Sequence, residues 1–165
     1  MGILRIVALA ALLCFRAAGR VSASDTLLNR PAPPFSRADL SGVRISLSAY
    51  DGKVVLLNFW ATWCAPCRIE LPRFAARQRQ YAPEGLQVLA VSMDDDPAAV
   101  RSLLRKLRPD YPILMGDAKL GEMYGGILGL PVTFLIDRHG IIRARFESEA
   151  DLSAMESQLR KLLSR

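Results

Sequence analysis

The sequence predicts an α/β domain with a mixed central sheet, and two patterns lead to that class. Short apolar runs alternate with helical stretches through the middle of the chain, an order typical of parallel strands joined by helices. Near the C-terminus, two further runs flank a tight turn at 138–140 and precede a closing helix, which indicates an added antiparallel hairpin. The 165 residues, 51% of them hydrophobic, suit one domain with a full core.

The elements are expected in the following order. Residues 39–48 alternate around a Ser–Gly pair and indicate an N-terminal β-hairpin, while the apolar runs at 53–59 and 85–92 are typical of strands buried on both faces. A helix is expected over 66–81, interrupted by Pro72 because proline removes a backbone hydrogen bond. The remaining elements are a helix capped by 94–96 and ending near 107, a strand at 111–115, a helix at 118–124, strands at 132–137 and 140–146, and a helix at 151–163.

The first 23 residues predict a secretory signal. A positive start is followed by the unbroken apolar run Ile6–Phe15 and by small residues that end at Ala23, the expected cleavage point. As a helix this run covers about half of a bilayer core, which is too short to span it. An uncleaved anchor remains the alternative because Arg16 places a charge between the run and the cut. Lipidation of Cys14 is not expected, since the bulky Leu13 precedes it.

Charge and metal-ligand content exclude several classes of function for the domain expected over 24–165. The net charge of +6 would fall by half with the three arginines of the leader, and basic residues are nowhere interleaved with aromatic ones, so no nucleic-acid partner is expected. A structural zinc needs about four ligands, and the chain has three cysteines and one histidine. Haem attachment needs a histidine where Arg68 stands. We therefore expect no metal and no bound cofactor.

Two cysteines at the junction of a buried strand and a helix carry the chemistry. Cys64 is placed at the helix N-terminus, where unpaired amide groups and the helix dipole favour a negatively charged sulfur. The thiolate is the nucleophile in thiol–disulfide exchange, so Cys64 is the expected attacking residue. Cys67 lies one turn deeper and would resolve the mixed disulfide, and Pro66 fits the first helical turn. A purely structural disulfide over so short a loop would constrain the unfolded chain little.

The run WATWCAPC, with Pro72 beyond it, resembles the thioredoxin fold, and more specifically the TlpA/ResA-like extracytoplasmic thiol–disulfide oxidoreductases. The preceding GKVVLLNF, Glu70 and the later GLPVTFLIDRHG sharpen the resemblance, which runs from about Pro33 to the last helix. It implies a thioredoxin-like fold with flanking helices, an N-terminal β-hairpin and a central βα insertion. It also implies that Pro131 is cis and faces the cysteine pair, which would leave the Leu130 backbone free to pair with an extended substrate.

The resemblance also assigns roles to residues near the pair. Asn58 stands where cytosolic thioredoxins carry a titrating aspartate, and Glu70, on the same helix face as Cys67, is the nearest titratable substitute. We expect Glu70 to accept or relay the Cys67 proton, although a glutamate that only complements the helix dipole is the alternative. Trp60 is expected to be structural, and Trp63 to be structural or to form a rim where a protein partner docks.

The function predicted from these residues is an exported thiol–disulfide oxidoreductase, in the periplasm or another extracytoplasmic space, that mainly reduces client disulfides through Cys64 and Cys67. The resemblance implies clients such as apocytochrome c or copper-site cysteines and a membrane thiol donor of the DsbD/CcdA type; a monomer is expected. A copper-site binding partner and a peroxiredoxin-like peroxidase are the alternatives. The peroxidase hypothesis is weakened because Ala61, and not a threonine, stands three residues before Cys64.

Overall fold

The structure is a computed structural model that describes residues 27–147 and 152–164. The predicted signal at 1–23, with Cys14, lies outside the described residues. Among the residues that the structure covers, no helix is both long and apolar enough to cross a bilayer.

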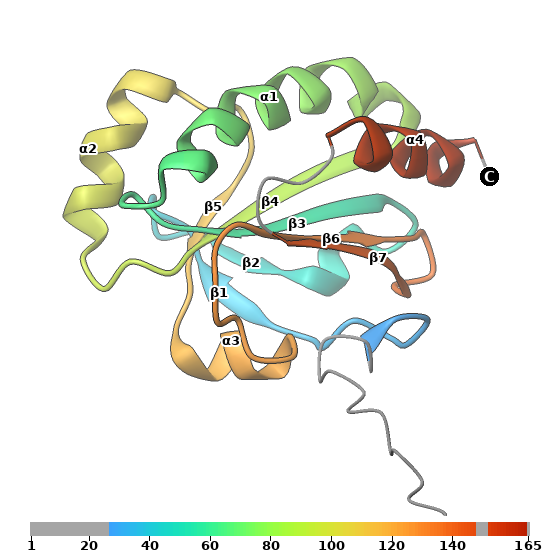
Figure 1. The fold of residues 1–165 in the computed structure, drawn as a ribbon, viewed down its shortest axis with the longest axis horizontal. Coiled ribbons are helices and arrows are strands. Elements are labelled where there is room, and N and C mark those ends of the chain that lie inside the picture. The colour runs from blue at the N-terminus through green and yellow to red at the C-terminus, as the bar shows by residue number, and fades with distance from the viewer. Residues whose placement is uncertain (1–26, 148–151, 165) are drawn as a thin grey trace, which may run out of the picture.

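A five-stranded mixed sheet forms the centre of the molecule, in the order β5-β4-β3-β6-β7 (Figure 1). β3, β4 and β5 run parallel, whereas β6 is antiparallel to β3 and β7 is antiparallel to β6. The strands are β3 (Val54–Trp60), β4 (Leu86–Ser92), β5 (Ile113–Met115), β6 (Val132–Ile136) and β7 (Ile142–Glu147). The predicted mixed sheet is confirmed, and β3 is its middle strand.

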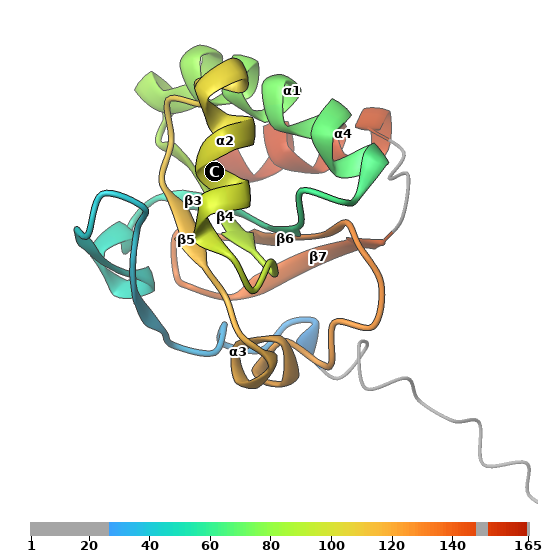
Figure 2. The ribbon, with the colours of Figure 1, turned by 90° about the vertical axis from the view of Figure 1, so that its left-hand side faces the viewer.

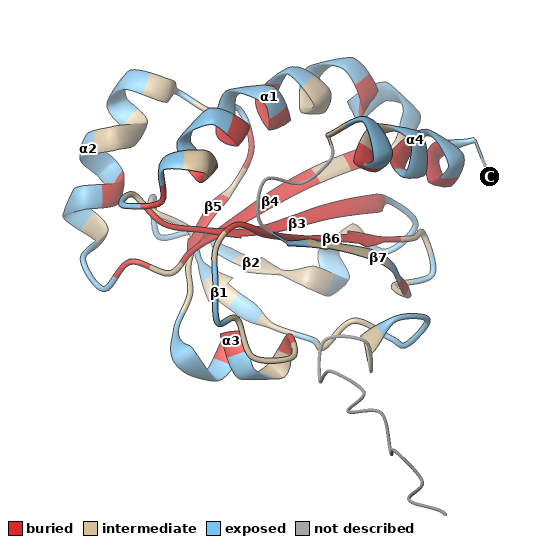
Figure 3. Cartoon of the chain, viewed as in Figure 1, coloured by how far each residue is buried: buried red, intermediate tan, exposed pale blue. Residues whose placement is uncertain are grey.

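Helices cover both faces of this sheet. α1 (Ala65–Tyr81), α2 (Pro97–Leu107) and α4 (Leu152–Leu163) lie on one face, while α3 (Ala118–Met123) and the N-terminal segment lie on the other, as Figure 2 shows from the side. Because side chains alternate along a strand, β3 feeds two cores: Leu56 and Trp60 pack on the α1 side, and Leu57 and Phe59 on the α3 side. All of β3 is therefore buried (Figure 3), which explains why its residues are apolar except Asn58.

The N-terminal hairpin pairs β1 (Ser36–Ala38) with β2 (Arg44–Ser46) and is followed by the 3-10 turn η2 (Leu47–Tyr50). The hairpin predicted at 39–48 is thus confirmed, although its first strand begins three residues earlier. Residue 39 starts the turn instead, because the Asp39 carboxylate accepts hydrogen bonds from the backbone amides of Ser41 and Val43, at 2.8 and 2.9 Å.

The expectation that Pro72 interrupts the first helix is wrong. α1 continues through Pro72 without a break and ends at η3 (Ala82–Glu84). Proline removes only one helical hydrogen bond, and the buried side chains of Leu71 and Phe74 on either side hold this stretch against the sheet. The Tyr111 hydroxyl also donates to the Leu71 carbonyl oxygen at 3.0 Å, which fastens the helix immediately before the proline.

The second half of the domain contains the expected βα insertion. Asp96 is the N-cap of α2 and accepts a hydrogen bond from the Ala98 amide at 2.8 Å, as the capping prediction required. β5 then extends the sheet beyond β4, and α3 packs Leu120 and the following Tyr124 into the second core. The tight turn at 138–140 between β6 and β7 is also present, and its Gly140 has a φ of +74° that favours glycine.

The closing helix is fixed to α1 through Glu156. Its carboxylate pairs with Arg77 at 2.7 Å and with Arg160 at 3.1 Å, and it accepts a hydrogen bond from the Tyr81 hydroxyl. Partial burial opposes ionisation of Glu156, but the hydrogen bonds outweigh this effect and lower its pKa. These contacts hold α1, the helix that carries Cys67, against α4.

Candidate active site

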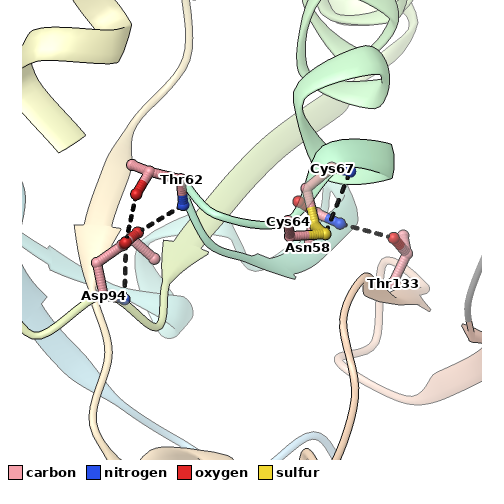
Figure 4. Close-up of a disulfide and its surroundings, with 7 residues drawn as sticks. Asn58, Thr62, Cys64, Cys67, Asp94 and Thr133 are labelled. Atoms are coloured by element: carbon pink, nitrogen blue, oxygen red, sulfur yellow. Dashed lines mark hydrogen bonds between the residues drawn. A yellow bond between two sulfur atoms is a disulfide. The ribbon is translucent and has the colours of Figure 1, made fainter. Parts of the chain in front are cut away.

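Cys64 ends the four-residue turn that joins β3 to α1, and Cys67 lies in the first turn of α1. The Cys64 amide donates to the Ala61 carbonyl oxygen at 3.2 Å and closes the turn, and Cys64 is the N-cap of α1. The Sγ atoms of Cys64 and Cys67 are bonded as a disulfide, with 5.3 Å between their Cα atoms (Figure 4). The predicted pair is therefore assembled at the strand-to-helix junction.

The surroundings of the two sulfurs differ. The Cys67 amide donates a hydrogen bond to Cys64 Sγ at 3.3 Å, so an unpaired amide of the first helical turn points at this sulfur. Pro66 fills the first turn, as expected. Cys64 keeps 5% of its surface exposed, against 1% for Cys67. Helix-end amides stabilise negative charge, so this geometry suits a thiolate at Cys64 and a shielded partner at Cys67.

A buried polar pair lies in the sheet on the α1 side. Asn58 shares its face of β3 with Leu56 and Trp60, and its side-chain amide donates to the Thr133 hydroxyl on β6 at 2.9 Å. The Asn58 amide thus has a hydrogen-bond partner within the sheet, and an amide does not gain or lose a proton at physiological pH. Glu70 is also buried, one helical turn beyond Cys67.

A second polar group, which the sequence did not identify, fixes the turn before Cys64. The Asp94 carboxylate, just after β4, accepts hydrogen bonds from the Thr62 amide at 2.8 Å and the Thr62 hydroxyl at 2.6 Å (Figure 4). The Ser92 hydroxyl donates a third, at 2.7 Å. The run of three aspartates indicated helix capping only. Pro97 at the first helical position marks Asp96 as the cap, but no local signal pairs Asp94 with Thr62.

The loop before β6 has the backbone that the resemblance implied. The Leu130–Pro131 peptide bond is cis and Pro131 is buried. Leu130 packs against the core that contains Trp60, Cys64 and Cys67. The cis proline and the cysteine turn therefore belong to one end of the sheet, beyond the C-terminus of β3 and the N-terminus of β6.

Apolar side chains project into solvent around this end of the sheet. Trp63, inside the cysteine turn, is 71% exposed, and Leu128, two residues before Leu130, is 100% exposed. Ile69, on the first turns of α1, is exposed as well. Trp63 was expected to be either structural or a rim residue, and its exposure favours the rim, whereas Leu128 and Ile69 were missed because a lone apolar residue carries no periodicity. We refer to Trp63, Ile69 and Leu128 as the apolar rim.

Within the described parts of the chain, no group of three or more histidine, cysteine, aspartate or glutamate side chains is placed to hold a metal ion. The chemistry that the Cys64–Cys67 pair offers is the making and breaking of one disulfide. A sheet of this order, with a Cys–Ala–Pro–Cys helix start and a cis proline at the same end of the sheet, defines a thioredoxin-like thiol–disulfide oxidoreductase.

Comparisons with known proteins agree with this class. Residues 28–145 match the AhpC/TSA family, and the chain belongs to this family. It is 32% identical over 137 residues to the thiol–disulfide oxidoreductase ResA of Bacillus thuringiensis subsp. konkukian, an alignment that covers 82% of this chain and 78% of the relative. ResA of Bacillus subtilis is 35% identical over 124 residues, covering 74% and 67%.

Solved structures give the same result. A Chlorobium tepidum structure described as the thiol:disulfide interchange protein DsbE superimposes with a TM-score of 0.76 at 31% identity, covering 81% of this chain and 95% of the other. A second protein of that organism, a thiol:disulfide interchange protein of the thioredoxin family, gives 0.74 at 28% identity, again covering 81% and 95%. The chain is therefore a thiol–disulfide oxidoreductase of the ResA/DsbE type.

Proposed function

We propose that the protein is an exported reductase of client disulfides in which Cys64 attacks and Cys67 resolves. The observation that carries this proposal is the hydrogen bond from the first-turn amide of Cys67 to Cys64 Sγ, in the more exposed residue of the pair. The Cys64 thiolate attacks one sulfur of a client disulfide, and the other client sulfur leaves as a thiolate. Cys67 then attacks Cys64, which releases the client dithiol and leaves the Cys64–Cys67 disulfide.

Each cycle moves two electrons to the client, so the disulfide must be reduced again by a donor. Exported compartments oxidise thiols, which makes a dedicated donor necessary. We propose a membrane thiol donor of the DsbD/CcdA type and clients such as apocytochrome c or copper-site cysteines. The Ala65–Pro66 pair between the cysteines lacks the histidine of strong disulfide donors and favours reduction. Export by the predicted signal at 1–23, or anchoring by it, and a monomeric state are parts of the same proposal.

Reduction of insulin disulfides by the purified protein, with dithiothreitol as the electron source, tests the proposed activity. We expect catalysis well above the dithiothreitol background and a reduction potential near that of thioredoxin, about −270 mV. A potential near that of the oxidant DsbA, about −120 mV, would contradict the reductase assignment. Stoichiometric Cu(I) uptake without insulin reduction would favour the copper-binding alternative instead.

The structure gives little support to a peroxidase. Three residues before Cys64 stands Ala61, and the hydroxyl of the neighbouring Thr62 is committed to Asp94. Peroxide turnover by a Cys67→Ser variant would nevertheless revive that function.

Client docking is proposed for the apolar rim and the cis-proline loop. An extended client segment would pair with the Leu130 backbone beside Pro131, while Trp63 and Leu128 cover its apolar side chains. A client must cross this surface to reach Cys64, because little of the cysteine itself is exposed.

Truncation of the rim should weaken docking without touching the chemistry. We expect Leu128→Ala and Trp63→Ala each to raise the KM for insulin by about five- to tenfold, the effect of losing an apolar anchor at an interface. The rate with oxidised glutathione, which is too small to span the rim, should stay within about twofold. Steady-state kinetics with both substrates measure this difference.

Leu28→Ala is the matched control for Leu128→Ala. Leu28 is also exposed, but its neighbour Asn29 bonds to Ile142 at the start of β7, the opposite end of the sheet. Equal KM values for the two alanine variants would contradict docking at the rim.

Glu70 is proposed as the proton acceptor or relay for Cys67. Its burial one turn from Cys67, on the same helix face, supports a role in exchanging a proton with the resolving thiol. We expect Glu70→Gln to lower the rate of resolution by about ten- to a hundredfold and to alter the pH–rate profile. Stopped-flow measurement of client release across pH tests this role.

Glu122→Gln, an exposed change on α3, should leave the pH–rate profile unaltered. A Glu70→Gln variant with the wild-type pH–rate profile and unchanged Cys64 acidity would rule out the proton-transfer role. Glu70 would then only complement the helix dipole.

A further inference from the structure

Asp94 is a buried carboxylate beneath the active-site turn to which the chemistry above gives no role. Its carboxylate oxygens are the acceptors in all three of its side-chain hydrogen bonds. The donors are the Thr62 amide, the Thr62 hydroxyl and the Ser92 hydroxyl. The Asp94 amide in turn donates to the Ser92 hydroxyl oxygen at 3.2 Å, which closes the network at the end of β4. The side chain of an ionised aspartate offers only acceptor atoms, which matches this set of donors.

The network holds the cysteine turn at its second residue. Thr62 follows Ala61, whose carbonyl oxygen accepts the Cys64 amide, and both donor groups of Thr62 are fastened to Asp94. The Met93 amide also donates to the Trp60 carbonyl oxygen at 2.8 Å, so the turn and the end of β4 are joined at two successive points. The position of Cys64 at the start of α1 therefore depends on Asp94.

The charge of Asp94 has a second effect, opposite to that of the helix end. The Asp94 carboxylate contacts Thr62, two residues before Cys64, and a buried negative charge at this place makes the Cys64 thiolate less favourable. Stabilising the reduced form is what makes a disulfide strongly oxidising, so weakening that stabilisation makes the pair more reducing.

We infer that Asp94 is a positioning residue that holds Cys64 at the helix start through Thr62 and biases the Cys64–Cys67 pair toward a reductant. This inference rests on the proposed reductase function, which it deepens by naming a residue that sets the direction of electron flow.

Three variants separate charge from position. Asp94→Asn removes the charge, while its amide oxygen can still accept from the Thr62 amide and the Ser92 hydroxyl, which share one carboxylate oxygen, and the Thr62 hydroxyl can rotate to accept from the new NH2 group. Thr62→Val removes one hydrogen bond and keeps the charge, and Thr62→Ser restores that bond. Asp95→Asn is the charge-matched control, because Asp95 is the exposed neighbour.

The readouts for charge need no client. The full-length protein is equilibrated with glutathione buffers, and alkylation of Cys64 is followed as a function of pH. We expect Asp94→Asn to shift the equilibrium toward the reduced form by roughly three- to tenfold and to move the alkylation profile to lower pH. Asp95→Asn should stay within about twofold of the wild type because solvent screens its charge.

Thr62→Val is expected to slow insulin reduction by about three- to tenfold, with recovery in Thr62→Ser, at a nearly unchanged equilibrium with glutathione. Equal equilibria and alkylation profiles for Asp94→Asn and Asp95→Asn, or wild-type turnover of Thr62→Val, would overturn the inference. If Asp94→Asn does not fold, Thr62→Val and Thr62→Ser still decide whether Asp94 positions Cys64 through Thr62. A wild-type protein that reduces no insulin would refute the proposed function, and the glutathione equilibria would still decide the role of Asp94.

Discussion

Serine at position 64 should abolish disulfide reduction, whereas serine at position 67 should stop the reaction after one covalent capture. Cys64 supplies the attacking thiolate, so its loss is expected to cut insulin reduction by about three orders of magnitude or more. Cys67→Ser retains the attacking sulfur, the helix-end amides and the apolar rim, and loses only the group that displaces the client. We expect a single stoichiometric burst of client thiol from this variant, followed by no turnover.

Cys14→Ser is the matched control for both changes. Cys14 is the third cysteine of the chain and falls in the predicted signal, so its replacement should leave the rate of insulin reduction unchanged. Sustained turnover by Cys64→Ser would show that Cys67 can act alone and would contradict the assigned order of attack. Stopped-flow and steady-state assays on the three variants distinguish these results.

Trp60→Ala is expected to cause the largest loss of stability among the residues of the site. Trp60 is fully buried at the end of β3, in the core shared by α1, α4 and both cysteines. Removing a buried aromatic side chain costs the transfer free energy of the lost atoms and leaves a cavity, about 3–5 kcal/mol in total. Urea unfolding of the oxidised protein, followed by circular dichroism, measures this free energy of unfolding.

Trp63→Ala tests the same chemical change three residues away. The Trp63 side chain is mostly exposed, so its truncation should change the free energy of unfolding by less than about 1 kcal/mol. We therefore expect Trp60→Ala to lower the free energy of unfolding and Trp63→Ala to raise the KM for the client. Similar losses of stability in both variants would contradict the placement of Trp60 in the core and Trp63 on the rim.

The central part of the fold could be predicted from the sequence because local pattern and tertiary environment agree there. β3 and β4 are buried on both faces, and such strands read as continuous apolar runs. The proline at 72 gave the wrong expectation, since the burial of Leu71 and Phe74 outweighs the local cost of proline. Tertiary packing, which no local pattern contains, decided the continuity of α1.

The sequence predicted those parts of the candidate site that depend on the spacing of residues along the chain. The Cys–Ala–Pro–Cys pattern after a buried strand placed both sulfurs and the helix start correctly. The cis bond at Pro131 came from resemblance only, because the cis and trans forms before proline differ by about 1 kcal/mol and local sequence does not separate them.

The contact between Asp94 and Thr62 joins residues 32 positions apart and could not be read from either segment. Each residue has an ordinary local interpretation, a helix cap for one and a loop hydroxyl for the other. Their pairing depends on β3 and β4 ending side by side, with Trp60 opposite Ser92. Only the sheet register shows which aspartate of the three reaches the turn.

Mass spectrometry of the mixed disulfide formed by Cys67→Ser with a reducible client tests the central claim most directly. The protein is reduced, mixed with an oxidised client, quenched with acid and digested, and the linked peptides are identified. We expect one linkage, from the client cysteine to Cys64, and no comparable adduct at Cys67 when Cys64→Ser is treated in the same way. A client linked to Cys67 in similar yield would show that the sulfur at the helix start has no special reactivity, and would contradict the account.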